Sequence, residues 1–111
     1  MPDLDAEDQK LITLARSSRA RVGAEEGAAV RDTDGRTYTA VTVDQPSFKL
    51  TAVQAAVAAA LSSGAEGLEA AAVVTGDVLV QEASVHAVRD VAKTAPIILA
   101  DPTGDVVEVL R

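Results

Sequence analysis

Cysteine is absent from the 111 residues of this chain, and aromatic side chains make up only 2% of them. Without cysteine there is no disulfide, no thiolate nucleophile and no cysteine-based metal site. Tyr38 and Phe48 are the only aromatic residues, while hydrophobic residues account for 48% of the chain. The core must therefore consist of valine, leucine, isoleucine and alanine, which predicts helices packed closely on a sheet. The length is that of a single domain, residues 1–111.

A concentrated positive face and a long apolar run are also missing. The formal net charge is −7, and the one basic cluster is Arg16, Arg19 and Arg21. Binding of nucleic acid needs a dense positive surface, so we predict no nucleic-acid partner. No apolar run approaches the roughly 20 residues that span a bilayer, so we predict no membrane partner. The acidic, polar start MPDLDAEDQK is unlike a targeting peptide, and we therefore expect a cytoplasmic protein.

What is present predicts alternating helices and strands. Asp3 or Asp5 can cap a first helix, the pair Asp34-Gly35 predicts a hairpin turn, and Ser84 can cap a third helix. Helices are expected at about 5–20, 50–62 and 85–93, and strands at 27–30, 36–44, 68–76, 95–102 and 105–110. The strand–helix–strand units in this order predict an α/β fold, with a mixed sheet covered by helices.

The stretch KLTAVQAAVAAAL (49–61) predicts a central helix made almost wholly of alanine and valine. It has no side chain that could bind a metal, move a proton or attack a substrate. QPSF (45–48), just before it, is expected to end the preceding strand. The alanine-rich face of residues 52–60 allows close approach either to the sheet or to a helix of a neighbouring subunit.

Three stretches, in order and with matching spacing, resemble the small zinc-dependent cytidine deaminases. GAAVRDTDGRTYTAVTVDQPSFKLT (27–51) resembles the first hairpin of that family and the approach to its second helix. EAAAVVT (69–75) resembles its central strand, and APIILADPTGDVVEVL (95–110) its closing hairpin. The resemblance implies a cytidine-deaminase-like three-layer αβα sandwich, a five-stranded mixed sheet with three helices. It also implies a homo-oligomer, a dimer or a tetramer.

The residues that carry the family's chemistry are missing from the matching positions. In the family, a C-A-E motif and a P-C-x-x-C motif at two helix starts hold one zinc, whose bound water attacks cytidine while the glutamate moves the proton. The resemblance puts Val53, Val85 and Val88 at the three ligand positions and Ala55 at the glutamate. We therefore predict no zinc cofactor and no catalytic residue. We also predict that the three valine side chains touch one another where the metal would be.

The family's nucleoside-binding residues have changed as well. Its N-x-E motif, which holds the ribose, reads Thr42-Val43-Asp44 here, and the chain contains no asparagine. The aromatic segment that walls the family's pocket corresponds to VGAEE (22–26), which has no aromatic residue. A vestigial nucleoside pocket would involve Thr42, Asp44, Ser47 and Phe48.

Other candidate sites are weak. His86 is the only histidine and lies one helical turn from Asp90, but a zinc site needs about three protein ligands. Ser84 does not share a helix face with His86, so a catalytic triad is not expected. Glu25 and Glu26 are adjacent and would point in different directions, so they do not predict a general acid–base pair.

Three functional hypotheses follow. The leading hypothesis is a non-catalytic cytidine-deaminase-like protein without zinc, with a structural or binding role. The first alternative is a nucleoside-binding module, and the resemblance taken alone implies hydrolytic deamination of a nucleoside. The weakest is an enzyme with new chemistry that uses Asp44 or His86, because no nucleophile–base pair is visible.

Overall fold

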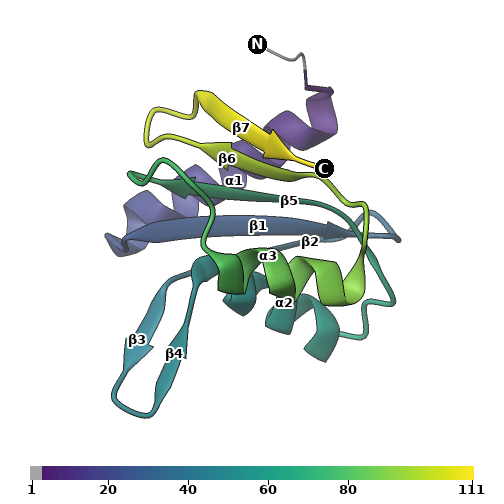
Figure 1. Cartoon of the computed structure of the whole chain (residues 1–111), viewed down its shortest axis with the longest axis horizontal. Helices are drawn as coiled ribbons and strands as arrows, with labels where there is room; N and C mark the ends of the chain where they lie inside the picture. Colours follow the sequence, from purple (N-terminus) through teal and green to yellow (C-terminus); the bar gives the residue numbers. More distant parts are fainter. Residues whose placement is uncertain (1–3) are drawn as a thin grey trace.

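A mixed five-stranded sheet separates one helix from two others in the computed structural model, which describes residues 4–111 (Figure 1). The strand order is β2-β1-β5-β6-β7; β5 and β6 are parallel and the other neighbours antiparallel. The strands are β1 (Glu26–Asp32), β2 (Thr37–Val41), β5 (Leu68–Thr75), β6 (Ile97–Ala100) and β7 (Val106–Leu110). The helices are α1 (Ala6–Val22), α2 (Ala52–Ser62) and α3 (Glu82–Val91). The predicted three-layer αβα sandwich is confirmed.

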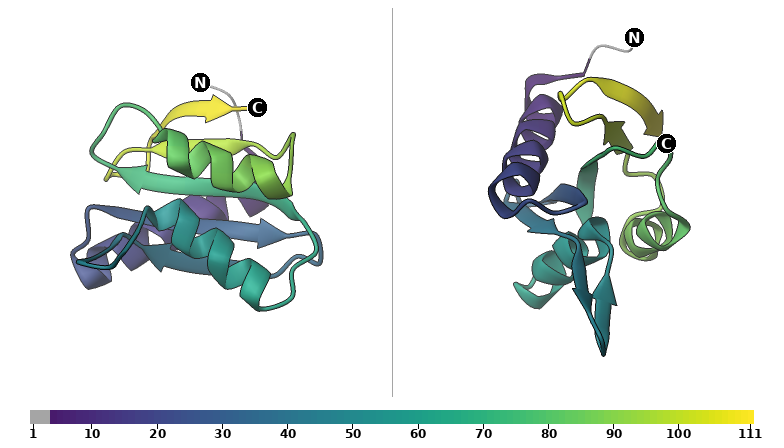
Figure 2. Two further views of the ribbon diagram at one scale, coloured as in Figure 1. Left: turned by 60° about the horizontal axis from the view of Figure 1, so that its bottom comes forward. Right: turned by 90° about the vertical axis from the view of Figure 1, so that its left-hand side faces the viewer.

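Both faces of the sheet are covered, which explains the unbroken apolar runs in its central strands. On β1, Ala28 and Val30 pack with α2 and α3, whereas Ala29 between them packs with α1. On β5, Val73 lies on the α2/α3 face and Val74 on the α1 face. Figure 2 shows α1 on one side of the sheet and α2 and α3 together on the other. The period-two alternation of the strands thus divides the aliphatic residues between two cores.

Helix α1 lies unusually close to β1. Its N-terminus is capped by Asp5, whose carboxylate accepts a hydrogen bond from the Asp8 N–H at 2.8 Å; the alternative cap, Asp3, lies outside the described residues. Gly27 faces the helix, and a Cβ atom there would lie 2.1 Å from the carbonyl oxygen of Ala15. Only glycine therefore permits this approach of helix to strand.

The β1–β2 hairpin is closed by the buried carboxylate of Asp32. Its Oδ1 accepts hydrogen bonds from the backbone N–H groups of Asp34 and Arg36, both at 2.9 Å, and its Oδ2 accepts one from the Tyr38 hydroxyl at 2.8 Å. Burial opposes ionisation, but these hydrogen bonds outweigh it and lower the pKa of Asp32 below its ordinary value. Gly35, with φ of 86°, supplies the left-handed residue of the turn, as its sequence predicts.

The strand predicted over 36–44 is too long. Strand β2 ends at Val41, and β3 (Val43–Gln45) pairs instead with β4 (Phe48–Leu50) in a separate two-stranded sheet. The chain leaves the main sheet at Thr42, because the Thr42 hydroxyl, not its carbonyl, accepts the N–H of Glu26 at 3.0 Å. QPSF (45–48), expected to break the strand, includes the tip of this hairpin, which projects from the body of the molecule (Figure 2).

The third helix begins earlier than predicted. Its N-cap is Gln81, which makes no side-chain capping bond, so the prediction that Ser84 caps the helix is wrong. Ser84 lies inside the first turn and is 1% exposed. Its hydroxyl instead makes a tertiary hydrogen bond to Thr51, in place of the local capping bond that the sequence predicts.

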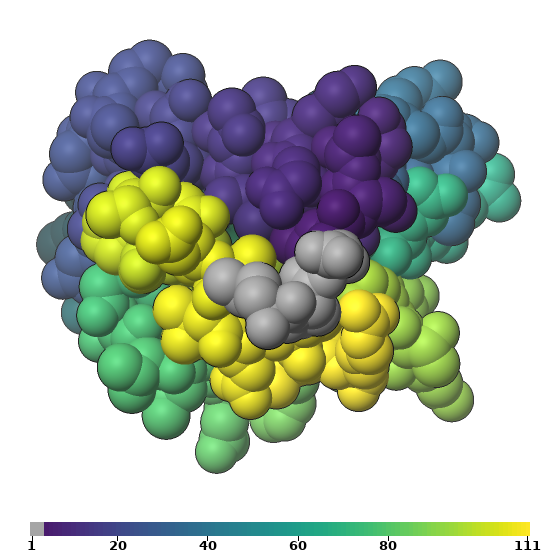
Figure 3. Space-filling view, turned by 90° about the horizontal axis from the view of Figure 1, so that it is seen from above, coloured from purple at the N-terminus to yellow at the C-terminus, as the bar shows by residue number. Residues whose placement is uncertain are grey.

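The turn at 101–104 anchors the far edge of the sheet to α1. Arg16 Nε donates a hydrogen bond to the carbonyl oxygen of Pro102 at 3.1 Å, and the space-filling view shows this turn against the helix (Figure 3). Thr103 donates to the Asp101 carboxylate from both its hydroxyl and its N–H, which lowers the pKa of Asp101. No helix within residues 4–111 has the length and apolarity required to cross a bilayer.

Candidate functional site

The N-termini of α2 and α3 meet at a pair of hydroxyl groups. Ser84 Oγ donates a hydrogen bond to Thr51 Oγ1 at 2.7 Å. Thr51 is the N-cap of α2 and forms a capping box with Gln54: its Oγ1 accepts the Gln54 N–H at 3.1 Å, and Gln54 Oε1 accepts the Thr51 N–H at 2.9 Å. The two helix starts are therefore held side by side by one polar contact.

Hydrocarbon side chains fill the space behind this contact. Val53 and Val88 are both 0% exposed and belong to one core cluster, against which the partly buried Val85 also packs. Val85 and Val88 lie one turn apart on α3, and Val53 is in the first turn of α2. Ala55 is half-buried on the same helix. Two of the three valines thus belong to one core cluster and the third packs against it, and that their side chains touch one another stays a prediction.

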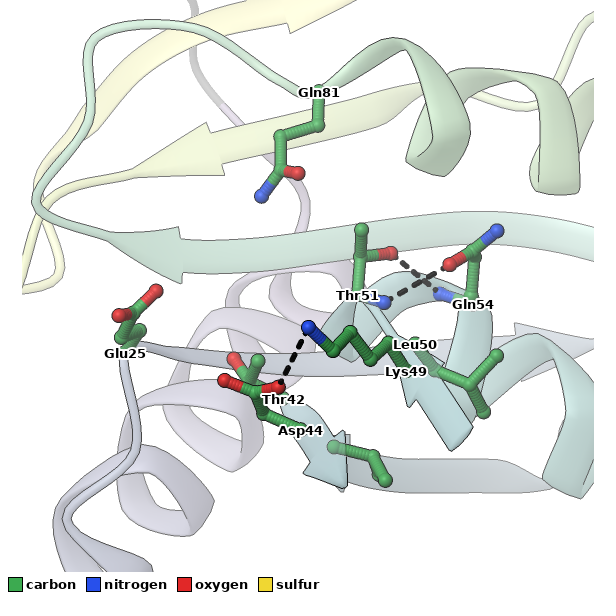
Figure 4. Close-up of a pocket in the computed structure, with 9 residues that line it drawn as sticks. Glu25, Thr42, Asp44, Lys49, Leu50, Thr51, Gln54 and Gln81 are labelled. Atoms are coloured by element: carbon green, nitrogen blue, oxygen red, sulfur yellow. Dashed lines mark hydrogen bonds and ion pairs between the residues drawn. The ribbon is translucent and has the colours of Figure 1, made fainter. Parts of the chain in front are cut away.

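A polar cleft of about 350 Å³ opens in front of the helix starts. Figure 4 shows Thr51 and Gln54 of α2 along one wall, with Gln81 at the start of α3 opposite the β3–β4 hairpin. Lys49 Nζ lies 3.6 Å from Asp44 Oδ1 across that hairpin. The complete lining is Glu25, Thr42, Val43, Asp44, Lys49, Leu50, Thr51, Gln54 and Gln81.

The residues predicted for a vestigial pocket divide into two pairs. Thr42 and Asp44 line the cleft. Ser47 and Phe48 do not, because they lie at the tip of the hairpin, where Phe48 is 57% exposed. The hairpin that replaces the expected single strand turns these two residues away from the helix starts.

Known proteins resemble this chain in both sequence and fold. A family model described as "Cytidine deaminase-like" matches residues 4–104. The chain belongs to the cytidine deaminase-like family. No curated protein matches it.

Solved cytidine deaminases share the fold of this family member. The cytidine deaminase from Burkholderia pseudomallei superposes with a TM-score of 0.78 at 24% identity, over 91% of this chain and 89% of that one. The enzyme from Mycobacterium leprae gives a TM-score of 0.71 at 21% identity, over 96% and 93% of the two chains. The enzyme from Mycobacterium tuberculosis gives 0.71 at 23% identity, over 92% and 89%. At these identities the likeness establishes the fold alone.

The residues at the cytidine deaminase-like helix starts do not fit the zinc that the family's fold implies. Zinc in proteins takes cysteine, histidine or carboxylate ligands, usually three of them in a catalytic site. Val53, Val85 and Val88 offer only methyl groups, and the nearby hydroxyls of Thr51 and Ser84 are already bonded to each other. Within residues 4–111 no group of three or more His, Cys, Asp or Glu side chains is placed to hold a metal ion.

His86 does not join the cleft. It is exposed on α3, as is Asp90 one turn later. Neither residue lines the cleft or makes a side-chain hydrogen bond within the part of the chain described, residues 4–111. The interpretation of His86 as a surface residue agrees with this placement.

Sequence reasoning weighed Glu26 only as half of an acid–base pair with Glu25 and missed it as a buried carboxylate beside the cleft. This residue begins β1 and is 4% exposed, and its Oε2 accepts a hydrogen bond from Gln81 Nε2 at 3.2 Å. Gln81 also lines the cleft, so the Glu26 carboxylate lies directly behind the cleft wall. The signal was the alternation of the strand: Glu26 is in phase with Ala28 and Val30, the residues that face α2 and α3.

Proposed function

We propose that this chain is a non-catalytic cytidine deaminase-like protein that binds a small polar molecule in its cleft and holds no zinc. The observation that carries the proposal is valine at every position where the resemblance expects a zinc ligand, with Val53 and Val88 buried and Val85 partly buried, beside an open cleft. Fold alone does not fix activity, because activity depends on the groups at the site.

The missing groups account for the expected loss of deamination. Hydrolysis of an aminopyrimidine needs a water made nucleophilic near neutral pH, and a carboxylate that carries protons to the leaving amine. Ala55 has only a methyl group at the position that the resemblance assigns to that carboxylate. Thr51 and Gln54 hydrogen-bond within the helix start, and neither is a proton shuttle at neutral pH.

Two measurements test the proposal. We expect metal analysis of protein purified from zinc-supplemented cultures to find far less than one zinc per chain. We also expect chromatography to detect no uridine above the enzyme-free rate after incubation with cytidine, with a known cytidine deaminase as positive control. Stoichiometric zinc, or uridine formed at an enzymatic rate, would refute the proposal.

A nucleoside is the second candidate for what the cleft holds. Thr42 and Asp44 still line it, and an aspartate can accept hydrogen bonds from ribose hydroxyls. Thermal unfolding with millimolar cytidine or uridine tests this directly, because a ligand that binds only the folded state raises the Tm. An unchanged Tm with both nucleosides would contradict nucleoside binding, and a different polar ligand would then be expected in the cleft.

A further inference from the structure

Glu26 places a buried carboxylate at the end of the sheet that faces the cleft. It is 4% exposed and pairs across β1 and β5 with Thr75, which is 3% exposed. Its backbone is fixed by Thr42, whose hydroxyl accepts the Glu26 N–H at 3.0 Å and whose N–H donates to the Glu26 carbonyl oxygen at 3.2 Å. The backbone of Glu26 is thus held between Thr42 on one side and β5 on the other.

One oxygen of this carboxylate lacks a protein partner. Oε2 accepts the hydrogen bond from Gln81, but no donor within residues 4–111 bonds to Oε1, which is fully buried. Burial of a charged group without its hydrogen bonds is costly in free energy. A donor from a bound ligand would satisfy this oxygen and remove that cost.

The hollow around Glu26 carries negative charge. A cavity of about 350 Å³ adjoins the cleft, with which it shares Glu25 and Gln81. Its ionisable residues are Glu25, Glu26 and Asp77 against the single cation Arg19, whose Nε donates to the Glu25 carbonyl oxygen at 2.9 Å. Such a hollow favours a cationic ligand over an anionic one.

We propose that Glu26 is the anchor for a small organic cation with adjacent N–H donors, a guanidinium or amidinium group. This inference rests on the proposed binding function and names its ligand class. Planar N–H pairs match the two oxygens of a carboxylate, and charge-assisted bonds of this kind are the strong ones. Oε1 has no hydrogen-bond donor within residues 4–111, and Oε2 can accept a ligand N–H once the Gln81 amide moves aside.

The Gln81 side chain covers the Glu26 carboxylate. It donates to Oε2, yet its side chain is on the surface at the start of α3. The preceding loop is exposed as well, at Val78 (77%) and Leu79 (61%). Displacement of the Gln81 amide opens the carboxylate to the cleft without disturbing the buried strands.

Titration with methylguanidinium and with methylurea, followed by amide resonances in NMR, tests the inference. The two probes have the same shape and differ in charge. We expect methylguanidinium to give saturable shifts at Glu26, Asp77 and Gln81, and methylurea to give none at equal concentration. Glu26→Gln should weaken methylguanidinium binding by at least about tenfold. Glu66→Gln, which removes an exposed carboxylate outside both hollows, should leave the binding unchanged.

A second variant keeps the test independent of folding. Gln81→Ala removes the side-chain amide that covers the Glu26 carboxylate, so this variant should bind methylguanidinium at least as tightly as the wild type. The Tm of Glu26→Gln should not fall, because the substitution removes a buried charge with an unpartnered oxygen and keeps an acceptor for the Gln81 amide. The inference is overturned if both probes give equal shifts or if methylguanidinium binding does not saturate. It is also overturned if Gln81→Ala binds methylguanidinium more weakly than the wild type, or if Glu26→Gln and Glu66→Gln lose equal affinity for it. Stoichiometric zinc or uridine production would refute the proposed function. If neither is found and methylguanidinium still fails to bind at Glu26, the inference alone is refuted.

Discussion

Ser84 and Thr51 join the N-termini of α3 and α2 through a hydroxyl–hydroxyl hydrogen bond of 2.7 Å. We expect Ser84→Ala to lower the free energy of unfolding by about 1 kcal/mol, because it removes a buried hydrogen bond. Thr51→Ala should cost roughly 0.5–2 kcal/mol, since it also removes the N-cap. Urea unfolding of both single variants and the double variant measures their coupling. Additive effects would contradict a direct contact, and Thr51→Ser, which keeps the hydroxyl, serves as the control.

The positions that the resemblance assigns to the zinc ligands can be tested by introducing cysteine there. We expect the triple variant Val53→Cys, Val85→Cys, Val88→Cys to bind one Co²⁺ or Zn²⁺ per chain, because three ligands plus water complete a tetrahedral site. Thiolate-to-cobalt absorption bands report the binding. The matched control moves one cysteine a turn along α2, with Val57→Cys in place of Val53→Cys, and should bind far more weakly. Equal affinity in the two variants would show that the helix starts do not define the site.

Gly27 sets the distance between α1 and β1. We expect Gly27→Ala to destabilise the protein by about 1–3 kcal/mol, because the new methyl group would meet the Ala15 carbonyl oxygen and Arg19. Gly76→Ala is the control, since a Cβ there has no atom within 4 Å. Thermal unfolding of the two variants makes the comparison. A Gly27→Ala protein as stable as wild type would mean that the helix is free to move outward.

Asp32 should make the β1–β2 hairpin sensitive to acid. Its pKa is lowered in the folded state, so its contribution to stability is present above the ordinary aspartate pKa of about 3.9 and is lost as pH falls through the lower folded value. We therefore expect Asp32→Asn to be less stable than wild type near pH 6, and the difference to shrink below pH 4. Tyr38→Phe, which removes one of the hydrogen bonds to the carboxylate, should show part of the same loss.

The exact pH window is checked by urea unfolding at a series of pH values. Asp34→Asn removes an exposed carboxylate from the same turn and controls for the change in net charge. A stability difference between Asp32→Asn and wild type that stayed constant from pH 6 to pH 3 would contradict the role given to the Asp32 hydrogen bonds.

The outer face of α2 is the surface where we expect a homo-oligomer to form. Ala52, Ala56 and Ala60 are all 0% exposed against the sheet, whereas Ala58 is exposed and Leu61 is 47% exposed. Light scattering at micromolar concentration should give the mass of a dimer or a tetramer, and Leu61→Glu should reduce it. A clean monomer mass for the wild type would refute this expectation.

Much of the fold could be predicted because the signals for it are local. The Asp34-Gly35 turn, the alanine-rich helix expected at about 50–62 and the double-sided apolar run of β5 are each determined by residues close in sequence. Hydrogen bonds and hydrophobic periodicity within a few residues decide such elements. The errors came where distant residues competed with local preference. Ser84 bonds to Thr51, 33 residues away, and is therefore not a cap, and the Thr42 bond to Glu26 ends β2 early.

The sequence by itself determined that the chain has no cysteine, and that Val53, Ala55, Val85 and Val88 carry no metal ligand and no acid–base group. It also determined the alternation that places one aliphatic set on each face of the sheet. Only the tertiary structure decided that Glu26 is buried behind the cleft with one oxygen that has no partner within residues 4–111, and that Phe48 is exposed and does not line the cleft. Burial and hydrogen-bond partners depend on which distant segments pack together, and no short stretch of sequence records that packing.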